Sequence, residues 1–222
     1  MTQLRSTRFR LAPWVVLGAA LLAVCAASPD AALADERVVV CLGDSLTEGY
    51  GLAPEQSYPS LLERMLRERG HAVRVVNAGV SGSTSASAAS RLRWQLRSRP
   101  DVVVIALGAN DGLRGVPVAT TKKNLSMAID LAQQSGARVL LAGMKIPPNY
   151  GLEYTMPFAA MFPALARKYG VALLPFLLEG VAAKPELNQP DGIHPNARGT
   201  EIVARNVLAA LEPLLEPAQA QP

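Results

Sequence analysis

The sequence predicts an α/β fold in which helices cover both faces of one parallel sheet. Short, continuous apolar runs alternate with longer segments of helical periodicity between residues 37 and 215. An apolar run without alternating polar residues is typical of a parallel strand buried on both faces. Strands that alternate with helices predict a parallel sheet. The chain has 222 residues, half of them apolar, which is enough for one such domain with a large core.

Five apolar runs are predicted as strands. The clearest is the run 101–107 (DVVVIAL), and the first along the chain is 38–42 (VVVCL). The others cover 72–76, 138–144 and a segment that begins at Val171. We therefore expect a five-stranded sheet.

Helices are predicted between these strands and after the last one. One apolar face, spaced at i, i+3, i+4, i+7 and i+8, is formed by Tyr58, Leu61, Leu62, Met65 and Leu66, and Gly70 ends this helix. Further helices are predicted over 85–99, from about 125 to Gly136, over 157–169, and from about 203 to 214. Five strand–helix units in this order predict a three-layer αβα domain with a flavodoxin-like parallel sheet.

The first residues are predicted to be a signal peptide, residues 1–34. A basic segment with three arginines precedes an apolar stretch over 11–27, and small residues over 32–34 fit a cleavage site. The remainder would be one domain over 35–215 with a flexible tail over 216–222. We expect a periplasmic or secreted protein, without a stable membrane span after cleavage. Two alternatives are an uncleaved membrane anchor and lipidation at Cys25.

Composition and charge argue against several kinds of partner. The formal net charge is +4 and falls to +2 without residues 1–34, and the arginines over 91–99 are expected to solvate one helix, so no nucleic-acid partner is predicted. Cys41 would be the one remaining cysteine, which excludes an intrachain disulfide and suggests a buried, inert thiol. With two histidines and no cluster of ligand spacing, we predict neither a metal nor a cofactor.

Polar and glycine residues follow three of the predicted strands, at the edge where parallel sheets bind ligands. The first strand is followed by 43–46 (GDSL), the second by 77–82 (NAGVSG) and the third by 108–111 (GAND). Gly43 would allow a sharp turn that presents the Ser45 hydroxyl. A Ser/Asp turn or helix cap is the structural alternative for 43–46. A phosphate loop is the alternative for 77–82, but its spacing fits no nucleotide motif.

Near the C-terminus, Asp191 precedes His194 by three residues. The carboxylate can fold back to accept the Nδ1 proton of His194, which leaves Nε2 free to take a proton from a hydroxyl. A turn with a solvent-facing histidine is the alternative. His71 lies at the opposite edge of the sheet, so His194 is the better candidate for a catalytic base.

Together these blocks resemble the GDSL, or SGNH, hydrolase superfamily. The stretches 107–115 (LGANDGLRG) and 142–151 (AGMKIPPNYG) resemble its periplasmic arylesterase and multifunctional thioesterase–lysophospholipase group. The resemblance implies Ser45 as nucleophile, and an oxyanion hole made by the Ser45 and Gly79 N–H groups and the Asn110 side chain. It implies a serine esterase or thioesterase that acts on aryl esters, acyl thioesters and lysophospholipids through an acyl-enzyme. Asp44 is interpreted as structural.

Substrate choice is expected to depend on the loops after the third and fourth strands. Tyr150, Leu152 and Leu113 would line an acyl groove, although the residues over 147–158 could equally pack a helix. Small ester, thioester or lysolipid molecules are the expected partners, and the sequence leaves the oligomeric state open. The alternatives to an esterase are a carbohydrate O-deacetylase of the same superfamily and a non-catalytic periplasmic protein that binds acyl chains or lipids.

Overall fold

The computed structural model describes Thr2 and residues 36–216, and residues 36–216 contain one five-stranded sheet. Its strands are β1 (Arg37–Gly43), β2 (Val73–Gly79), β3 (Val102–Ala106), β4 (Arg138–Ala142) and β5 (Ala172–Leu174). All pairs are parallel, in the order β2-β1-β3-β4-β5. This is the flavodoxin-like order, so the predicted fold class is confirmed. The chain reverses direction across the sheet between β1 and β3, which is where such folds bind ligands.

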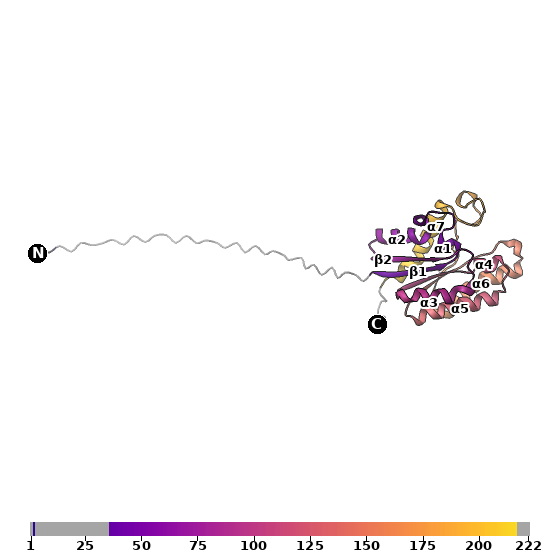
Figure 1. Cartoon of the computed structure of the whole chain (residues 1–222), viewed down its shortest axis with the longest axis horizontal. Helices are drawn as coiled ribbons and strands as arrows, with labels where there is room; N and C mark the ends of the chain where they lie inside the picture. The colour runs from indigo at the N-terminus through magenta and orange to yellow at the C-terminus, as the bar shows by residue number, and fades with distance from the viewer. Residues whose placement is uncertain (1, 3–35, 217–222) are drawn as a thin grey trace. The chain divides into compact units, whose positions relative to one another are not determined.

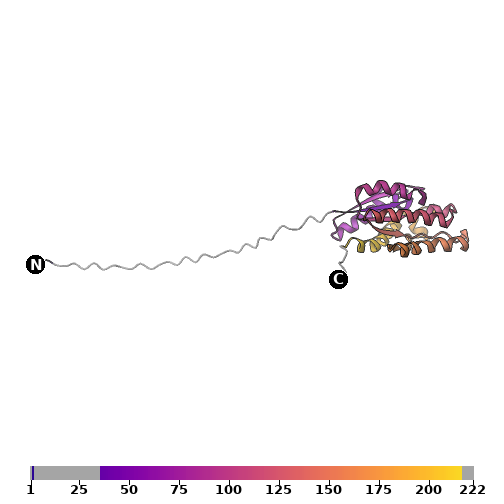
Figure 2. The same cartoon turned by 90° about the horizontal axis from the view of Figure 1, so that it is seen from below.

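Helices cover both faces of the sheet (Figure 1). On one face lie α1 (Ser45–Glu48), α2 (Tyr58–Glu68) and α7 (Ala197–Leu211), of which α2 and α7 pack against each other. On the other face lie α3 (Ala88–Gln95), α4 (Ala109–Leu113), α5 (Val118–Gln134) and α6 (Leu152–Tyr169). Figure 2 shows α3, α5 and α6 side by side. The predicted three-layer arrangement is therefore correct.

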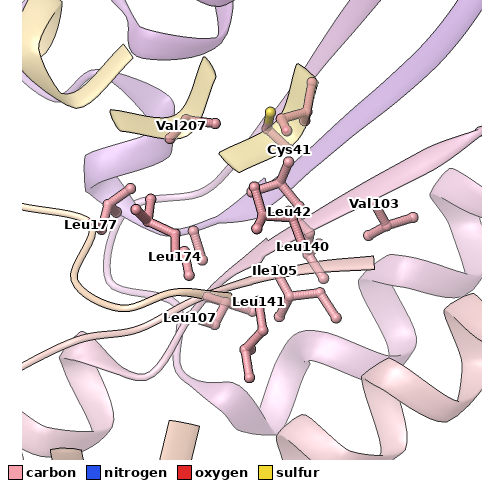
Figure 3. Packing of buried hydrophobic residues seen from close by; sticks show 14 of the residues in the cluster. Cys41, Leu42, Val103, Ile105, Leu107, Leu140, Leu141, Leu174, Leu177 and Val207 are labelled. Carbon is pink, nitrogen blue, oxygen red and sulfur yellow. The ribbon is translucent and has the colours of Figure 1, made fainter. Parts of the chain in front are cut away.

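The core lies between the sheet and these two helical layers. All five residues of β3 are buried, and Figure 3 shows Val103 and Ile105 among leucines of the neighbouring strand, such as Leu140 and Leu141. Cys41 is fully buried in the same cluster, as predicted. Burial raises the pKa of its thiol to about 12, which keeps it protonated and unreactive.

Three local predictions need correction. The predicted helix over 85–99 is divided into a 3₁₀ turn (Ser85–Ser87), α3 and a second 3₁₀ turn (Leu96–Ser98). Helix α6 begins at Leu152, five residues before the predicted start, because Pro157 lies within the helix and does not begin it. Arg91 is not fully solvated, since its Nη2 donates to the carbonyl of Ala78 and its Nη1 is buried without a hydrogen-bond partner in the described part of the chain.

Residues 36–216 contain no helix that is long and apolar enough to cross a membrane. The predictions about residues 1–34, including cleavage and the alternative of lipidation at Cys25, lie outside the described residues, as do those for most of the tail.

Candidate active site

The turn after β1 places Ser45 at the start of a helix. Gly43 is required there for space, since a Cβ on it would overlap the side chain of Thr47. The turn that Gly43 was expected to allow does not rely on a positive φ, which Gly43 does not have. Asp44 is the N-cap of α1, and its Oδ1 accepts the Leu46 N–H at 3.0 Å. Ser45 is the first residue of α1, at the carboxyl edge of the sheet.

His194 lies against Ser45, although 149 residues separate them in the sequence. Its Nε2 is 2.9 Å from Ser45 Oγ, and its Nδ1 is 2.7 Å from Asp191 Oδ2. These distances are those of hydrogen bonds. The structure thus joins the three predicted residues in one chain of contacts, from hydroxyl to imidazole to carboxylate.

Asp191 is held by the backbone of its own loop. Its Oδ1 accepts the N–H groups of Ile193 and His194, both at 2.9 Å, and Gly192, directly after Asp191, has a φ of +70°. The backbone and ring N–H donors of His194 lower the pKa of the Asp191 carboxyl to about 2. Asp191 is therefore ionised at neutral pH and can stabilise a protonated imidazole.

Asn110 is the second residue of α4 and lies near the turn that carries Ser45. Its Nδ2 donates to the carbonyl of Ser83 at 3.0 Å and lies 3.5 Å from Asp44 Oδ2. The second of these distances is at the limit for a hydrogen bond. Asn110 is therefore anchored through Ser83 and lies beside the residue that precedes Ser45.

Gly79 does not have the geometry expected of an oxyanion donor. Its N–H already donates to Asn77 Oδ1 at 2.9 Å. A Cβ on Gly79 would overlap the backbone of Glu48, so the glycine allows β2 to pack closely against α1. In this structure the Gly79 N–H is therefore already engaged, and the glycine has a packing role. Three residues later Gly82, with a φ of +74°, precedes Ser83 in the loop that contacts Asn110.

The predicted substrate-binding residues are brought together in part. The Tyr150 hydroxyl donates to the carbonyl of Leu113 at 2.9 Å, which joins the loops after β3 and β4. Leu152 is 67% exposed, but it begins α6 and does not belong to a loop as expected. Within residues 36–216, no hydrogen bond links these three residues to Ser45, Asp191 or His194.

The sequence reasoning assigned no role to two residues around this site. Asp111 is the last residue of the predicted block 108–111, and its buried carboxylate accepts the Ser85 N–H at 2.8 Å and anchors the loop before α3. Gln189 lies two residues before Asp191 and donates from its side chain to the carbonyl of Tyr50 at 2.6 Å. Neither contact has a signal in the sequence beyond the position of the residue in or beside a predicted block. Among the described residues, no group of three or more His, Cys, Asp or Glu side chains could hold a metal ion.

Comparisons with known proteins agree with this geometry. Residues 41–202 match the GDSL-like lipase/acylhydrolase family. An arylesterase from Vibrio mimicus is 43% identical over 182 residues, which are 82% of this chain and 90% of the relative. Esterase TesA from Pseudomonas aeruginosa is 41% identical over 180 residues, or 81% and 90% of the two chains. Thioesterase 1/protease 1/lysophospholipase L1 from Escherichia coli K12 is 38% identical over 186 residues, or 83% and 87%.

Solved structures give the same result. A crystal structure of TesA superimposes with a TM-score of 0.78 at 41% identity and covers 80% of this chain and 99% of its own. The psychrotrophic esterase EstA from Pseudoalteromonas, inhibited by monoethylphosphonate, superimposes with a TM-score of 0.77 at 33% identity, covering 81% and 98%. The chain belongs to the GDSL-like lipase/acylhydrolase family, and it is a carboxylic ester hydrolase of that family.

Proposed function

We propose that this protein hydrolyses esters with Ser45 as nucleophile, His194 as general base and Asp191 as the residue that orients the imidazole. The observation that carries the proposal is the continuous chain of hydrogen bonds from Ser45 Oγ to Asp191 Oδ2 through both ring nitrogens of His194. A hydroxyl is a weak nucleophile unless a base takes its proton, and a third group must fix the tautomer of that base. The three side chains supply these parts.

In the first half of the reaction, Ser45 Oγ attacks the acyl carbonyl and its proton passes to His194 Nε2. The tetrahedral intermediate collapses when Nε2 returns this proton to the leaving alcohol or thiol, which leaves the acyl group on Ser45. The ionised Asp191 carboxylate stabilises the imidazolium at both stages. Water then releases the acid and restores Ser45.

The oxyanion needs preorganised donors at the same place. Ser45 is the first residue of a helix, and its N–H has no hydrogen-bond acceptor within residues 36–216. The N–H of Gly82 likewise lacks an acceptor in the described region and belongs to the loop beside Asn110. We therefore assign the oxyanion hole to the Ser45 and Gly82 N–H groups and the Asn110 amide, with Gly82 in place of Gly79.

Aryl esters, acyl thioesters and lysophospholipids are the proposed substrates, in keeping with the names of the three relatives. We propose that Tyr150, Leu113 and Leu152 form one wall of the acyl site, supported by the hydrogen bond between the first two and the exposure of the third. Exchanging residues 150–152 should shift the preferred acyl chain length. An unchanged preference would count against this wall.

Export to the periplasm or beyond the cell is also proposed, with removal of residues 1–34. The support is the order of a basic segment, an apolar stretch and small residues in this part of the sequence. Intact mass of the protein recovered from the periplasm should correspond to a chain that begins at Asp35. A full-length chain in the membrane fraction would favour an anchor, and loss of attachment in Cys25→Ala would favour lipidation.

Labelling with a fluorophosphonate tests the nucleophile. The wild-type protein should gain one adduct, on Ser45, and Ser45→Ala should gain none. Ser87→Ala is a matched control, since within residues 36–216 the one hydrogen bond of the Ser87 hydroxyl is to the backbone carbonyl of Thr84, at 3.0 Å. Labelling of Ser45→Ala at the wild-type rate would refute the assignment. If the protein only binds acyl chains and has no activity, neither the wild type nor Ser45→Ala should gain an adduct.

A further inference from the structure

The catalytic side chains come from two segments that are far apart in the sequence. We call residues 44–51 the nucleophile segment and residues 188–195 the histidine loop. In the described part of the chain, two hydrogen bonds join them. One is the bond between His194 Nε2 and Ser45 Oγ at 2.9 Å. The other is donated by Gln189 Nε2 to the carbonyl of Tyr50 at 2.6 Å.

Gln189 forms the base of the histidine loop. Its N–H donates to the carbonyl of His194 at 2.7 Å, and its own carbonyl accepts the Gly192 N–H at 2.9 Å. Its side-chain Nε2 also donates to the carbonyl of Pro195 at 3.1 Å. The residue thus fixes the loop at three points around His194, in addition to its bond with the nucleophile segment.

The nucleophile segment contacts Gln189 and His194 through Tyr50 and Gly51. The Tyr50 N–H donates to the carbonyl of Ser45 at 3.1 Å, so Gln189 is connected to the backbone of Ser45 through one residue. The Tyr50 ring packs on the His194 ring, with 4.7 Å between their centroids. Gly51 has a φ of +74°, and a Cβ on it would overlap Gln189 Oε1. The nucleophile segment therefore fits closely around the Gln189 side chain.

One of the two connecting hydrogen bonds is lost when the acyl-enzyme forms. In the free enzyme both are present. In the acyl-enzyme, Ser45 Oγ is bonded to the acyl carbon and has no hydrogen to donate to His194. The bond from Gln189 to Tyr50 is then the remaining one of the pair. His194 nevertheless has to stay at the same place, because it must now activate water.

We propose that Gln189 is a positioning residue that keeps His194 in place for deacylation. This inference rests on the proposed function of Ser45 and His194. In deacylation, water attacks the acyl carbonyl and gives one proton to His194 Nε2. The tetrahedral intermediate then breaks its bond between carbon and Ser45 Oγ, the same proton returns to Oγ, and the carboxylic acid leaves. Gln189 touches none of the reacting atoms.

The test separates acylation from deacylation in Gln189→Met, which keeps the side-chain length and removes both side-chain hydrogen bonds. Stopped-flow hydrolysis of an activated aryl ester gives the two rate constants. We expect deacylation to slow by about tenfold, the value of one ordinary hydrogen bond, while acylation changes by less than about twofold. As a consequence kcat and KM should fall together, and kcat/KM should stay near the wild-type value.

Gln133→Met is a matched control. The Gln133 side chain also donates to a backbone carbonyl, that of Tyr169, at 2.9 Å, but on the exposed side of α5. It should leave both rate constants unchanged. Gln189→Glu is the second variant, in case the methionine destabilises the loop, because its carboxylate keeps the polar character and cannot donate to Tyr50. It should show the same selective loss.

The outcomes are distinct. Equal slowing of acylation and deacylation, or no slowing of either, in a folded Gln189 variant would overturn the inference while leaving Ser45 as the nucleophile. If the wild-type enzyme forms no acyl-enzyme on Ser45, the proposed function itself fails. Thermal unfolding of each variant identifies a general loss of structure, which would slow both steps and so also count against a selective role.

Discussion

The pH dependence of stability should be dominated near the active site by Asp44. This carboxyl is 1% exposed and lies beside the nucleophile. Burial raises its pKa from 3.8 to about 6, against the smaller opposing effects of the Leu46 N–H and of electrostatic interactions with His194 and Arg91. In the unfolded chain the group returns to its ordinary pKa. Folding and proton binding are therefore coupled at this residue.

Between pH 4 and pH 6 the folded protein binds more protons at Asp44 than the unfolded chain does, so stability falls as the pH rises through this window. A pKa difference of about 2 corresponds to about 3 kcal/mol, and the loss is complete above the folded pKa. Asp44→Asn removes this titration. Part of this change already lies below pH 4, so the free energy of unfolding of the variant, minus that of the wild type, should increase by about 2 kcal/mol between pH 4 and pH 7.

Urea unfolding of both proteins at a series of pH values measures this difference. Titrations shared by the two proteins cancel, and any cap lost in Asp44→Asn adds only a constant offset. A difference that stays constant with pH would refute a raised pKa. A difference that decreases with pH would mean that the folded state favours the ionised form of Asp44.

Three further predictions concern single residues. Asn110→Ala should lower kcat by about 10²–10³ with little change in KM, and a near-normal kcat in steady-state assays would remove Asn110 from the oxyanion hole. Asp191→Asn should lower kcat by about 10⁴, through the wrong histidine tautomer; a smaller loss than that of Asn110→Ala would contradict its role. Cys41, in a chain that starts at residue 35, should react with a thiol reagent at pH 8 only after unfolding, because burial raises its pKa to about 12; rapid reaction of the native protein would contradict this.

Much of the fold could be predicted because buried parallel strands have a strong local signal. The run that becomes β3 is apolar throughout, and all five of its residues are buried. The positions of 43–46 and 108–111 after their strands could be predicted for the same reason, since the edge of a parallel sheet follows from where its strands end. The pairing of Asp191 with His194 needs only a short local turn.

Contacts across the fold had no comparable signal. The bond from Gln189 to Tyr50 joins residues 139 apart, and nothing in either residue type indicates it. The packing role of Gly79 could not be predicted from the sequence. A small residue is needed there because β2 passes close to the backbone of Glu48 in α1, and that approach depends on the tertiary structure. The start of α6 could not be predicted because Pro157 is typical of a helix start, yet here the helix accommodates it five positions after its first residue.

The most direct test of the proposed mechanism is hydrolysis of a chain-length series of aryl esters and acyl thioesters by the wild-type protein and by Ser45→Ala. The arrangement of Ser45, His194 and Asp191 predicts turnover by the wild type and none above background by Ser45→Ala. Equal turnover by the two proteins, or turnover of no member of the series by the wild type, would contradict the assignment of Ser45 as the nucleophile for these substrates.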